Sequence, residues 1–455
     1  MLERKFTQCL ERFLTEEHHK ILLVNGARQI GKSYIIRHVG RKMFRHFVEI
    51  NLKEDKEGMR VFADVHTTGD LYMRLSNYNR KPLGDNSDTL VFLDEIQSYP
   101  HLMTLLKFLN QESRYRFIAS GSQLGVALSQ TPSVPLGSVT IEQMYPLDFE
   151  EFLWATGVGK EWIESIRERF LRQEALDEST HNLILQRFQH YLLVGGLPEA
   201  INKYLSDRNI SRVRQTHRDI HNLYRIDASQ YDDDHRLKIR KIYDLIPSNL
   251  ENKKKRIVYK DIEGKTGKTF SDYADELEYL TNSGVALEVS AISNPRFPLV
   301  ESEQKRLVKL YLNDVGLLTS LLYGLNVNAV LQDIRSINLG TVYESVIAQE
   351  LLAHGFKLHY YDNKKTGEVD FLIDDYDHLT VLPIEVKSGK DYTQHSALSK
   401  FLGTPDYGID CAIVFSNERL VFKKKGTTYL PIYYCMFLQS ECREEPVILP
   451  ALEEI

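Results

Sequence analysis

Residues 21–33 read Ile21-Leu22-Leu23-Val24-Asn25-Gly26-Ala27-Arg28-Gln29-Ile30-Gly31-Lys32-Ser33, and this stretch decides the fold of the first third of the chain. Its first four residues form a continuous apolar run, which is typical of a strand buried on both faces. The last eight match the pattern G-x-x-x-x-G-K-[ST], and residues 34–39 are suited to a helix. A strand, a glycine-containing turn and a helix in this order predict a loop that binds phosphate.

Each residue type in this loop suits the binding of a nucleotide. Glycines let backbone N–H groups turn onto phosphate oxygens. The ammonium of Lys32 is expected to reach the β- and γ-phosphates, and the hydroxyl of Ser33 is expected to ligate Mg²⁺. The predicted nucleotide-binding residues are Gly26, Ala27, Arg28, Gln29, Ile30, Gly31, Lys32 and Ser33.

The composition of the whole chain indicates which class of protein carries this site. A chain of 455 residues predicts about two to four domains. With 42% hydrophobic and 26% charged residues it is typical of a soluble globular protein, and its net charge of −6 gives no global attraction to nucleic acid. Four scattered cysteines predict a reducing compartment and argue against a zinc site or a disulfide scaffold. With no leader-like segment and no long apolar run, we expect a cytoplasmic protein without a membrane role.

A second candidate element of the nucleotide site is the run of residues 89–95, which resembles a Walker B strand. Its apolar residues end in Asp94 and Glu95, at the strand end where ligands bind in open α/β sheets. Asp94 is predicted to hold Mg²⁺, and Glu95 to polarise the attacking water as a catalytic residue together with Lys32. A further strand, residues 116–120, ends in Ser120, which either senses the γ-phosphate or begins a loop of small residues.

These features together resemble the prokaryotic AAA-family ATPases that carry a C-terminal domain of unknown function. The resemblance rests on the loop, on residues 94–97, on Ser120-Gly121-Ser122, on residues 146–153 and on residues 193–200. It implies a P-loop NTPase domain with a parallel α/β sheet of the AAA type over residues 1–155, with ATP and Mg²⁺ as cofactors. Where the family usually has Gly-Arg-Val, this chain has Gly137-Ser138-Val139; an arginine that senses phosphate would be missing here.

The middle of the chain predicts a helical connector over residues 156–235 and a winged helix over residues 236–330. Helices are expected at 237–250, 258–264 and 269–282, and strands at 285–289 and 307–311. The basic residues Lys253, Lys254, Lys255, Arg256, Lys260, Lys265 and Lys268 favour DNA binding. The acidic residues Asp272, Asp275, Glu276 and Glu278 of the third helix favour a structural or partner-docking role instead. The run 264–269 imitates a phosphate loop but follows a helix, and Asp232-Asp233-Asp234 predicts a solvated loop.

A second candidate site lies near the end of the chain. Asp370, followed one strand later by Glu385-Val386-Lys387, resembles the PD-(D/E)xK motif, with Val369 in the place of its proline. This resemblance implies a restriction-endonuclease-like α/β domain over residues 331–455. The period of two along a strand puts Glu385 and Lys387 on one face. Asp370 and Glu385, with Glu344 from the helix 337–354, are the predicted Mg²⁺ ligands. Lys387 and Glu385 are the predicted catalytic residues, because the lysine can stabilise a hydroxide or developing charge.

Two functions fit this organisation. In the first, an ATP-driven machine controls a Mg²⁺-dependent nuclease that acts on DNA or RNA. In the second, the chain is an ATP-dependent switch or interaction protein with an inactive nuclease-like domain. ATP is the expected ligand in both cases; DNA, RNA or a protein partner and an oligomer are left open.

Overall fold

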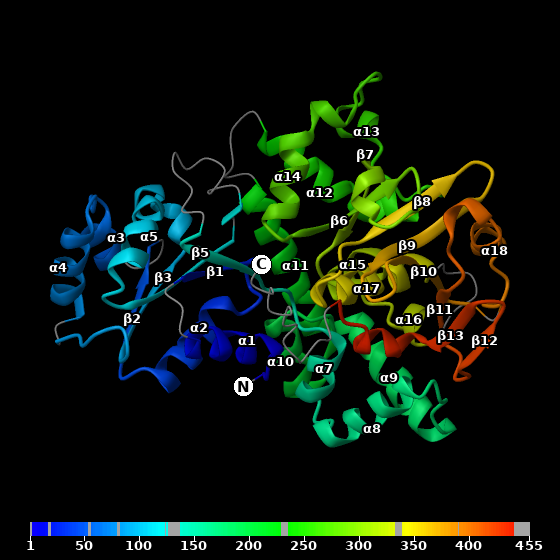
Figure 1. The fold of residues 1–455 in the computed structure, drawn as a ribbon, viewed down its shortest axis with the longest axis horizontal. Helices are drawn as coiled ribbons and strands as arrows, with labels where there is room; N and C mark the ends of the chain where they lie inside the picture. Colours follow the sequence, from blue (N-terminus) through cyan, green and yellow to red (C-terminus); the bar gives the residue numbers. More distant parts are fainter. Residues whose placement is uncertain are drawn as a thin grey trace, which may run out of the picture.

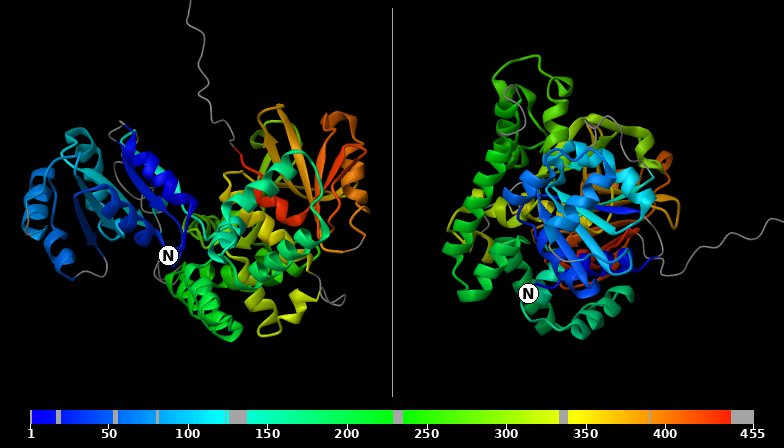
Figure 2. Two further views of the ribbon diagram at one scale, coloured as in Figure 1. Left: turned by 90° about the horizontal axis from the view of Figure 1, so that it is seen from below. Right: turned by 90° about the vertical axis from the view of Figure 1, so that its left-hand side faces the viewer.

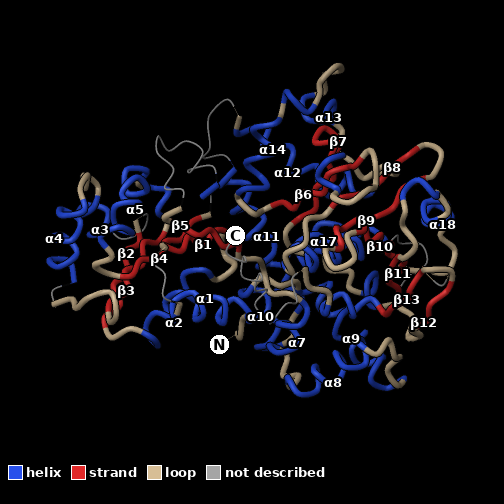
Figure 3. Tube along the Cα trace, viewed as in Figure 1, coloured by secondary structure: helices blue, strands red, loops and turns tan. Residues whose placement is uncertain are grey.

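The computed structural model describes residues 2–16, 20–52, 56–79, 82–122, 124–125, 137–228, 235–332, 339–389 and 391–440. Two β-sheets lie at opposite ends of the molecule, with helices between them (Figures 1 and 3). The left view of Figure 2 shows the N-terminal sheet with its helices set to one side of the remaining elements. Within the described ranges, no helix has both the length and the apolar character needed to cross a membrane.

The first sheet is parallel throughout, in the order β2-β3-β4-β1-β5. Its strands are β1 (Ile21–Asn25), β2 (His46–Asn51), β3 (Thr89–Asp94), β4 (Arg116–Gly121) and β5 (Val139–Gln143). The strands run parallel, and β4 lies between β1 and β3. The loop after β1, the end of β4 and the acids at the end of β3 therefore meet at the carboxyl ends of the strands. The sequence analysis predicted β1, β3 and β4, and it did not predict β5.

Helices cover both faces of this sheet, which explains the continuous apolar run of β1. Leu22 and Val24 point into a core shared with the first two helices, and Ile21 and Leu23 point into a second core on the other face. The first face is covered by α1 (Lys5–Thr15) and α2 (Lys32–Met43), and the second by α3 (Lys56–Phe62), α4 (Thr68–Asn79) and α5 (Pro100–Glu112).

The middle of the described chain is helical, as predicted. Its helices are α7 (Phe149–Ala155), α8 (Lys160–Leu171), α9 (Glu178–Val194), α10 (Pro198–Asp207), α11 (Ile210–Ala228), α12 (Arg236–Glu251), α13 (Tyr259–Glu263) and α14 (Ala274–Asn282). Gly264 has a left-handed backbone and ends α13, so the run 264–269 follows a helix as expected. The helix expected at 269–282 begins only at Ala274, because Thr269 and Asp272 form a capping box on the 3-10 turn before it. Residues 232–234 lie outside the described ranges.

The second sheet has the order β12-β13-β11-β10-β9-β8-β6-β7. Its strands are β6 (Ala286–Ile292), β7 (Glu303–Leu312), β8 (His359–Asn363), β9 (Gly367–Asp375), β10 (Thr380–Lys387), β11 (Ala412–Ser416), β12 (Phe422–Lys424) and β13 (Thr427–Pro431). The strands expected at 285–289 and 307–311 form and pair as the hairpin β6–β7. However, β6 also pairs with β8, so one sheet runs across the boundary predicted at residues 330 and 331.

Helices pack on both faces of this second sheet. The buried apolar residues of α17 (Gly340–Ala353) join the large central core, and those of α18 (Ser396–Leu402) join a separate core on the other face. Two shorter helices, α15 (Val315–Tyr323) and α16 (Asn328–Leu331), connect β7 to the C-terminal part.

A glycine pair joins the two halves of the molecule. The N–H of Leu147 donates to the carbonyl of Gly196 (2.8 Å), and the N–H of Gly196 donates to Oδ2 of Asp314 (2.6 Å). A Cβ at Gly196 would lie 2.0 Å from the carbonyl oxygen of Leu147. The close approach of two backbones at this point therefore requires glycine.

We expect Gly196→Ala to lower the free energy of unfolding by about 1–3 kcal/mol, because the methyl group meets backbone that cannot move aside cheaply. Urea denaturation of the full chain measures this. Gly159→Ala is the matched control, since a Cβ there meets no atom within 4 Å. Equal stability of the two variants would contradict the role of Gly196.

Candidate functional site

The predicted phosphate loop joins β1 to α2 with the backbone that its sequence requires. Gly26 and Gly31 have φ angles of 146° and 96°, and a Cβ at Gly26 would lie 2.4 Å from the carbonyl oxygen of Met144. Lys32 begins α2, and its Nζ donates to the carbonyls of Gly26 and Ala27, both at 2.8 Å. The loop is thus closed around the lysine, with the N-terminus of a helix directly behind it.

Burial changes the acid–base properties of this lysine. It lowers the pKa of Lys32 to about 8, although the nearby carboxylates of Glu95 and Asp94 act to raise it. The ammonium is therefore held at a cost in solvation, which a bound polyphosphate would offset.

Asp94 lies where the loop, β3 and β4 meet. Its Oδ2 accepts a hydrogen bond from the hydroxyl of Ser33 (2.8 Å) and a longer one from the amide of Asn51 (3.4 Å), and its Oδ1 accepts from the hydroxyl of Ser120. Burial raises the pKa of Asp94, and the hydrogen bonds from Ser120 and Ser33 oppose this shift. The two residues predicted to ligate Mg²⁺ in this site are therefore in direct contact.

Glu95 follows at the end of β3 with a left-handed backbone (φ 57°) that turns its side chain out of the strand direction. Its Oε2 accepts a hydrogen bond from the amide of Gln97 (2.7 Å). Glu95 lines the cavity beside the loop, whereas Ser120 is fully buried behind Asp94. The contact between Ser120 and Asp94 favours a positioning role over direct contact with phosphate.

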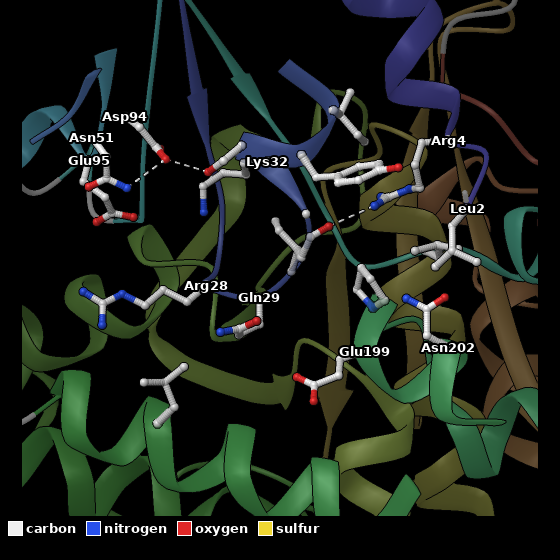
Figure 4. A pocket seen from close by; sticks show the side chains of 18 residues that line it. Leu2, Arg4, Arg28, Gln29, Lys32, Asn51, Asp94, Glu95, Glu199 and Asn202 are labelled. Atoms are coloured by element: carbon white, nitrogen blue, oxygen red, sulfur yellow. Dashed lines mark hydrogen bonds between the residues drawn. The ribbon is translucent and has the colours of Figure 1, made fainter. Parts of the chain in front are cut away.

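A cavity of about 720 Å³ opens beside the loop and is closed from the other side by helices of the connector. Figure 4 shows Lys32, Asp94 and Glu95 on its sheet side, facing Glu199 and Asn202 of α10. Its lining residues are Leu2, Arg4, Arg28, Gln29, Ile30, Gly31, Lys32, Ser33, Tyr34, Ile35, Asn51, Asp94, Glu95, Leu147, Pro198, Glu199, Asn202 and Leu223.

Sequence reasoning missed two parts of this cavity. Arg4 is buried, and its guanidinium donates to the carbonyls of Ile30 (3.0 Å) and Tyr145 (2.6 Å) and to Oε2 of Glu151 (3.0 Å). No motif surrounds Arg4, so only its contact with the loop identifies it. Glu199 follows the Gly-Gly-Leu-Pro turn already noted as similar to the family, and that turn was the available signal for the α10 wall.

Arg28 connects the loop to the connector. Its guanidinium forms an ion pair with Asp227 of α11, and its carbonyl accepts a hydrogen bond from Tyr224 (3.0 Å). Of the eight loop residues predicted to bind nucleotide, those from Arg28 to Ser33 line the cavity, while Gly26 and Ala27 lie beneath them and hold Lys32.

Ser138, at the position where the family usually has arginine, lies beside the start of β1. The carbonyl of Ser138 accepts a hydrogen bond from the N–H of Ile21 (3.0 Å), and Val139 pairs with Ile21 at the start of β1. This is the end of the parallel sheet opposite the phosphate loop, about 16 Å away along a strand of five residues. Within this chain, residue 138 is therefore remote from the phosphate loop.

The predicted C-terminal site lies on β9, β10 and α17. Nζ of Lys387 donates to Oε1 of Glu385 (2.6 Å), and Oδ2 of Asp370 accepts from the N–H of Val386 (2.9 Å). Burial, followed by the nearby Asp370 carboxylate, raises the pKa of Glu385 to about 8 and that of Glu344 to about 7. All four predicted residues are therefore brought into one electrostatic cluster.

This cluster does not have the geometry of a metal centre. In the described part of the chain, no three His, Cys, Asp or Glu side chains are arranged to hold a metal ion. The Glu344 carboxylate instead accepts a hydrogen bond from Lys255, which comes from the turn after α12. As they stand, the residues present do not fit the predicted Mg²⁺ site of Glu344, Asp370 and Glu385.

The basic residues expected to meet DNA are largely engaged within the chain. Lys255 pairs with Glu344, Arg256 with Asp362, Lys265 with Glu263 and Lys268 with Asp272. Lys253, Lys254, Lys260 and Lys265 are exposed. These pairings weaken the electrostatic case for a DNA contact through this unit.

Family comparisons divide the chain into three matched stretches. Residues 18–153 match an AAA domain, residues 185–329 match a domain of unknown function (DUF8612), and residues 339–435 match another (DUF4143). The expected combination of an AAA domain with a C-terminal domain of unknown function is confirmed. Together with its parallel sheet, the first match identifies the N-terminal unit as a P-loop NTPase domain. Among curated proteins, none matches this chain significantly.

Many solved structures match this chain, and two of them illustrate how limited the similarity is. The Walker-type ATPase PABY2304 of Pyrococcus abyssi is 14% identical, with 71% of this chain and 96% of that chain covered and a TM-score of 0.42. The Hsp104–ADP complex of S. cerevisiae is 12% identical, with 62% and 38% covered and a TM-score of 0.29. At these TM-scores the similarities carry no argument about function.

We expect nucleotide affinity to fall as the pH rises above about 8. Below this pH Lys32 is already charged before the nucleotide binds. Above it, binding must first return a proton to the amine, so the affinity falls by about tenfold for each pH unit. Titration with a fluorescent ATP analogue between about pH 7 and pH 9.5 measures this. Lys32→Arg is the control, because a guanidinium stays charged across this range. A flat wild-type profile would contradict the expectation.

Proposed function

We propose that this chain binds ATP with Mg²⁺ and hydrolyses it at the site formed by the phosphate loop, Asp94 and Glu95. The observation that carries the proposal is the 2.8 Å contact between Ser33 and Asp94 beside a cavity lined by Lys32 and Glu95. The match of residues 18–153 to an AAA domain supports it.

The residues present fit both ligands. Ser33 and Asp94 offer hard oxygen donors of the kind that Mg²⁺ prefers. The loop is tightly turned at Gly26, where a Cβ would collide with Met144, and the α2 N-terminus favours anions. When bound, Mg²⁺ supplies positive charge to the phosphate oxygens during transfer to water.

Each side chain of the site has a distinct part. Lys32 supplies a cation at the loop, and its bonds to two loop carbonyls hold it there. Ser120 and Asn51 orient the Asp94 carboxylate. The Gln97 amide fixes Glu95 at the cavity, where its carboxylate polarises the attacking water.

We expect Lys32→Ala to abolish ATP binding, and Glu95→Gln to keep binding while lowering turnover by about 100-fold or more, the range for loss of a general base. Equilibrium titration and phosphate release measure the two quantities. Lys42→Ala, on the exposed last turn of the same helix, is the matched control. Unchanged hydrolysis in Lys32→Ala and in Glu95→Gln would refute the assignment.

The second proposal concerns the C-terminal unit, for which we infer a nuclease-like fold that acts on or binds nucleic acid. Its support is the chain order β8-β9-β10-α18-β11, which brings Asp370 and the Glu385–Lys387 pair to neighbouring strands. The alternative is an ATP-dependent switch with an inactive unit. The lysines that engage Glu344 and Glu385 favour this alternative in the state described here.

Labelled single- and double-stranded DNA and RNA, incubated with Mg²⁺ or Mn²⁺ with and without ATP, test this second proposal. If the unit is a nuclease, the wild type cleaves and Glu385→Ala loses at least about 100-fold of that activity, because the motif carboxylate is removed. Asp406→Ala, at an exposed turn of the same unit, is the control. No cleavage by the wild type, or equal cleavage by Glu385→Ala, supports the switch.

A further inference from the structure

Two carbonyl groups of the phosphate loop accept hydrogen bonds from side chains that lie outside the loop. Arg4, near the start of the chain, donates from Nη1 to the carbonyl of Ile30 (3.0 Å), a bond marked in Figure 4. Tyr224 of α11 donates its hydroxyl to the carbonyl of Arg28 (3.0 Å). Both donors are buried, with exposed fractions of 6% and 1%. The loop is therefore held by two segments that are remote from it in the chain.

A peptide unit that is held by its oxygen also has a fixed direction for its hydrogen. In a planar trans peptide the C=O and the N–H of the next residue point in opposite directions. The bond to the carbonyl of Ile30 therefore turns the N–H of Gly31 away from the guanidinium. In the same way, the bond to the carbonyl of Arg28 turns the N–H of Gln29 away from the phenol.

These two N–H groups are left available for a ligand. In the described part of the chain, the N–H groups of Gln29 and Gly31 donate to no other protein group, and both residues line the cavity. Their φ angles are 66° and 96°, a left-handed backbone that glycine adopts readily and glutamine seldom does. Backbone N–H groups in such turns form concave sites that bind anions. The bond from Tyr224 helps to hold the unfavourable backbone at Gln29.

Two other carbonyl groups of the loop are engaged from inside it. Those of Gly26 and Ala27 accept hydrogen bonds from Nζ of Lys32, both at 2.8 Å. A carbonyl oxygen that turned toward a phosphate would repel it, so each of these oxygens has to be kept in place. Lys32 holds two of them, and the donors from outside the loop hold the other two.

We propose that Arg4 and Tyr224 are positioning residues of the nucleotide site. By holding two loop carbonyls, they aim the N–H groups of Gly31 and Gln29 at the phosphates of a bound nucleotide. They act through the loop backbone, so removing either hydrogen bond weakens the binding of the phosphates and leaves the binding of the nucleoside unchanged. The inference rests on the proposed function, because it requires a nucleotide at this loop.

Tyr224→Phe is the sharpest variant, because it removes one hydroxyl and keeps the buried ring. Tyr243→Phe is the matched control: Tyr243 is also 1% exposed, its ring lies edge-on to Tyr224 (6.4 Å between centroids), and its hydroxyl contacts His221. Competition with a fluorescent ATP analogue measures the affinity of the full chain for ADP and for adenosine. We expect the affinity for ADP to fall about three- to tenfold in Tyr224→Phe, the range for one hydrogen bond, and to stay unchanged in Tyr243→Phe. The affinity for adenosine should be the same in all three proteins.

Arg4→Lys tests the second carbonyl. Lysine keeps a cation beside the buried Glu151, but it lacks the planar fork that reaches the carbonyls of Ile30 and Tyr145 together. Because hydrogen bonds from a charged donor are stronger, we expect the affinity for ADP to fall about tenfold or more, again without a change for adenosine. Urea denaturation without ligand shows whether each variant is folded.

The outcomes separate the inference from the function on which it rests. If folded Tyr224→Phe and Arg4→Lys bind ADP as tightly as the wild type, or lose ADP and adenosine affinity equally, the positioning role is overturned and the nucleotide site stands. If the wild type does not bind ADP, the proposed function is overturned and the inference with it.

Discussion

The hydrogen bond between Ser33 and Asp94 is the contact on which the nucleotide site depends. It joins the first turn of α2 to the end of β3, two segments that are 61 residues apart in the chain. Burial makes the carboxylate costly to ionise, and the Ser120 hydroxyl on the intervening strand offsets part of this cost. The order β3-β4-β1 is thus required by the chemistry: a strand between loop and acid supplies the hydroxyl that orients the acid.

The same site is built from more than one unit. Arg28 reaches α11, α10 forms the facing wall of the cavity, and Arg4 holds the carbonyl of Ile30 from the start of the chain. The Gly195-Gly196 turn between α9 and α10 is packed between Leu147 and Asp314. A ligand that fills the cavity would therefore contact the P-loop domain and the helical connector at once. Its binding energy would depend on how the two are held together.

Local motifs were the predictable part of this molecule. The loop and the acid pair are each determined by short-range requirements, so their elements could be placed from residues 21–39 and 89–95. The edge strand β5 has a half-exposed pattern with little apolar periodicity and was missed. The position of Ser138 depends on the order of the strands in the sheet. The cavity wall formed by α10 depends on packing between helices that are remote in the sequence. Lys255 was noted only as one of seven basic residues, because its partner lies 89 positions away.

The pairing of β6 with β8 makes the hairpin and the C-terminal strands one hydrogen-bonded body. Rotating the hairpin against the following unit would break these backbone bonds, so any rearrangement must carry both together and bend elsewhere. Dividing the chain between residues 332 and 339 would leave β8 with a bare edge, open to pairing with other molecules. An isolated C-terminal fragment would thus be prone to self-association for reasons unrelated to its chemistry.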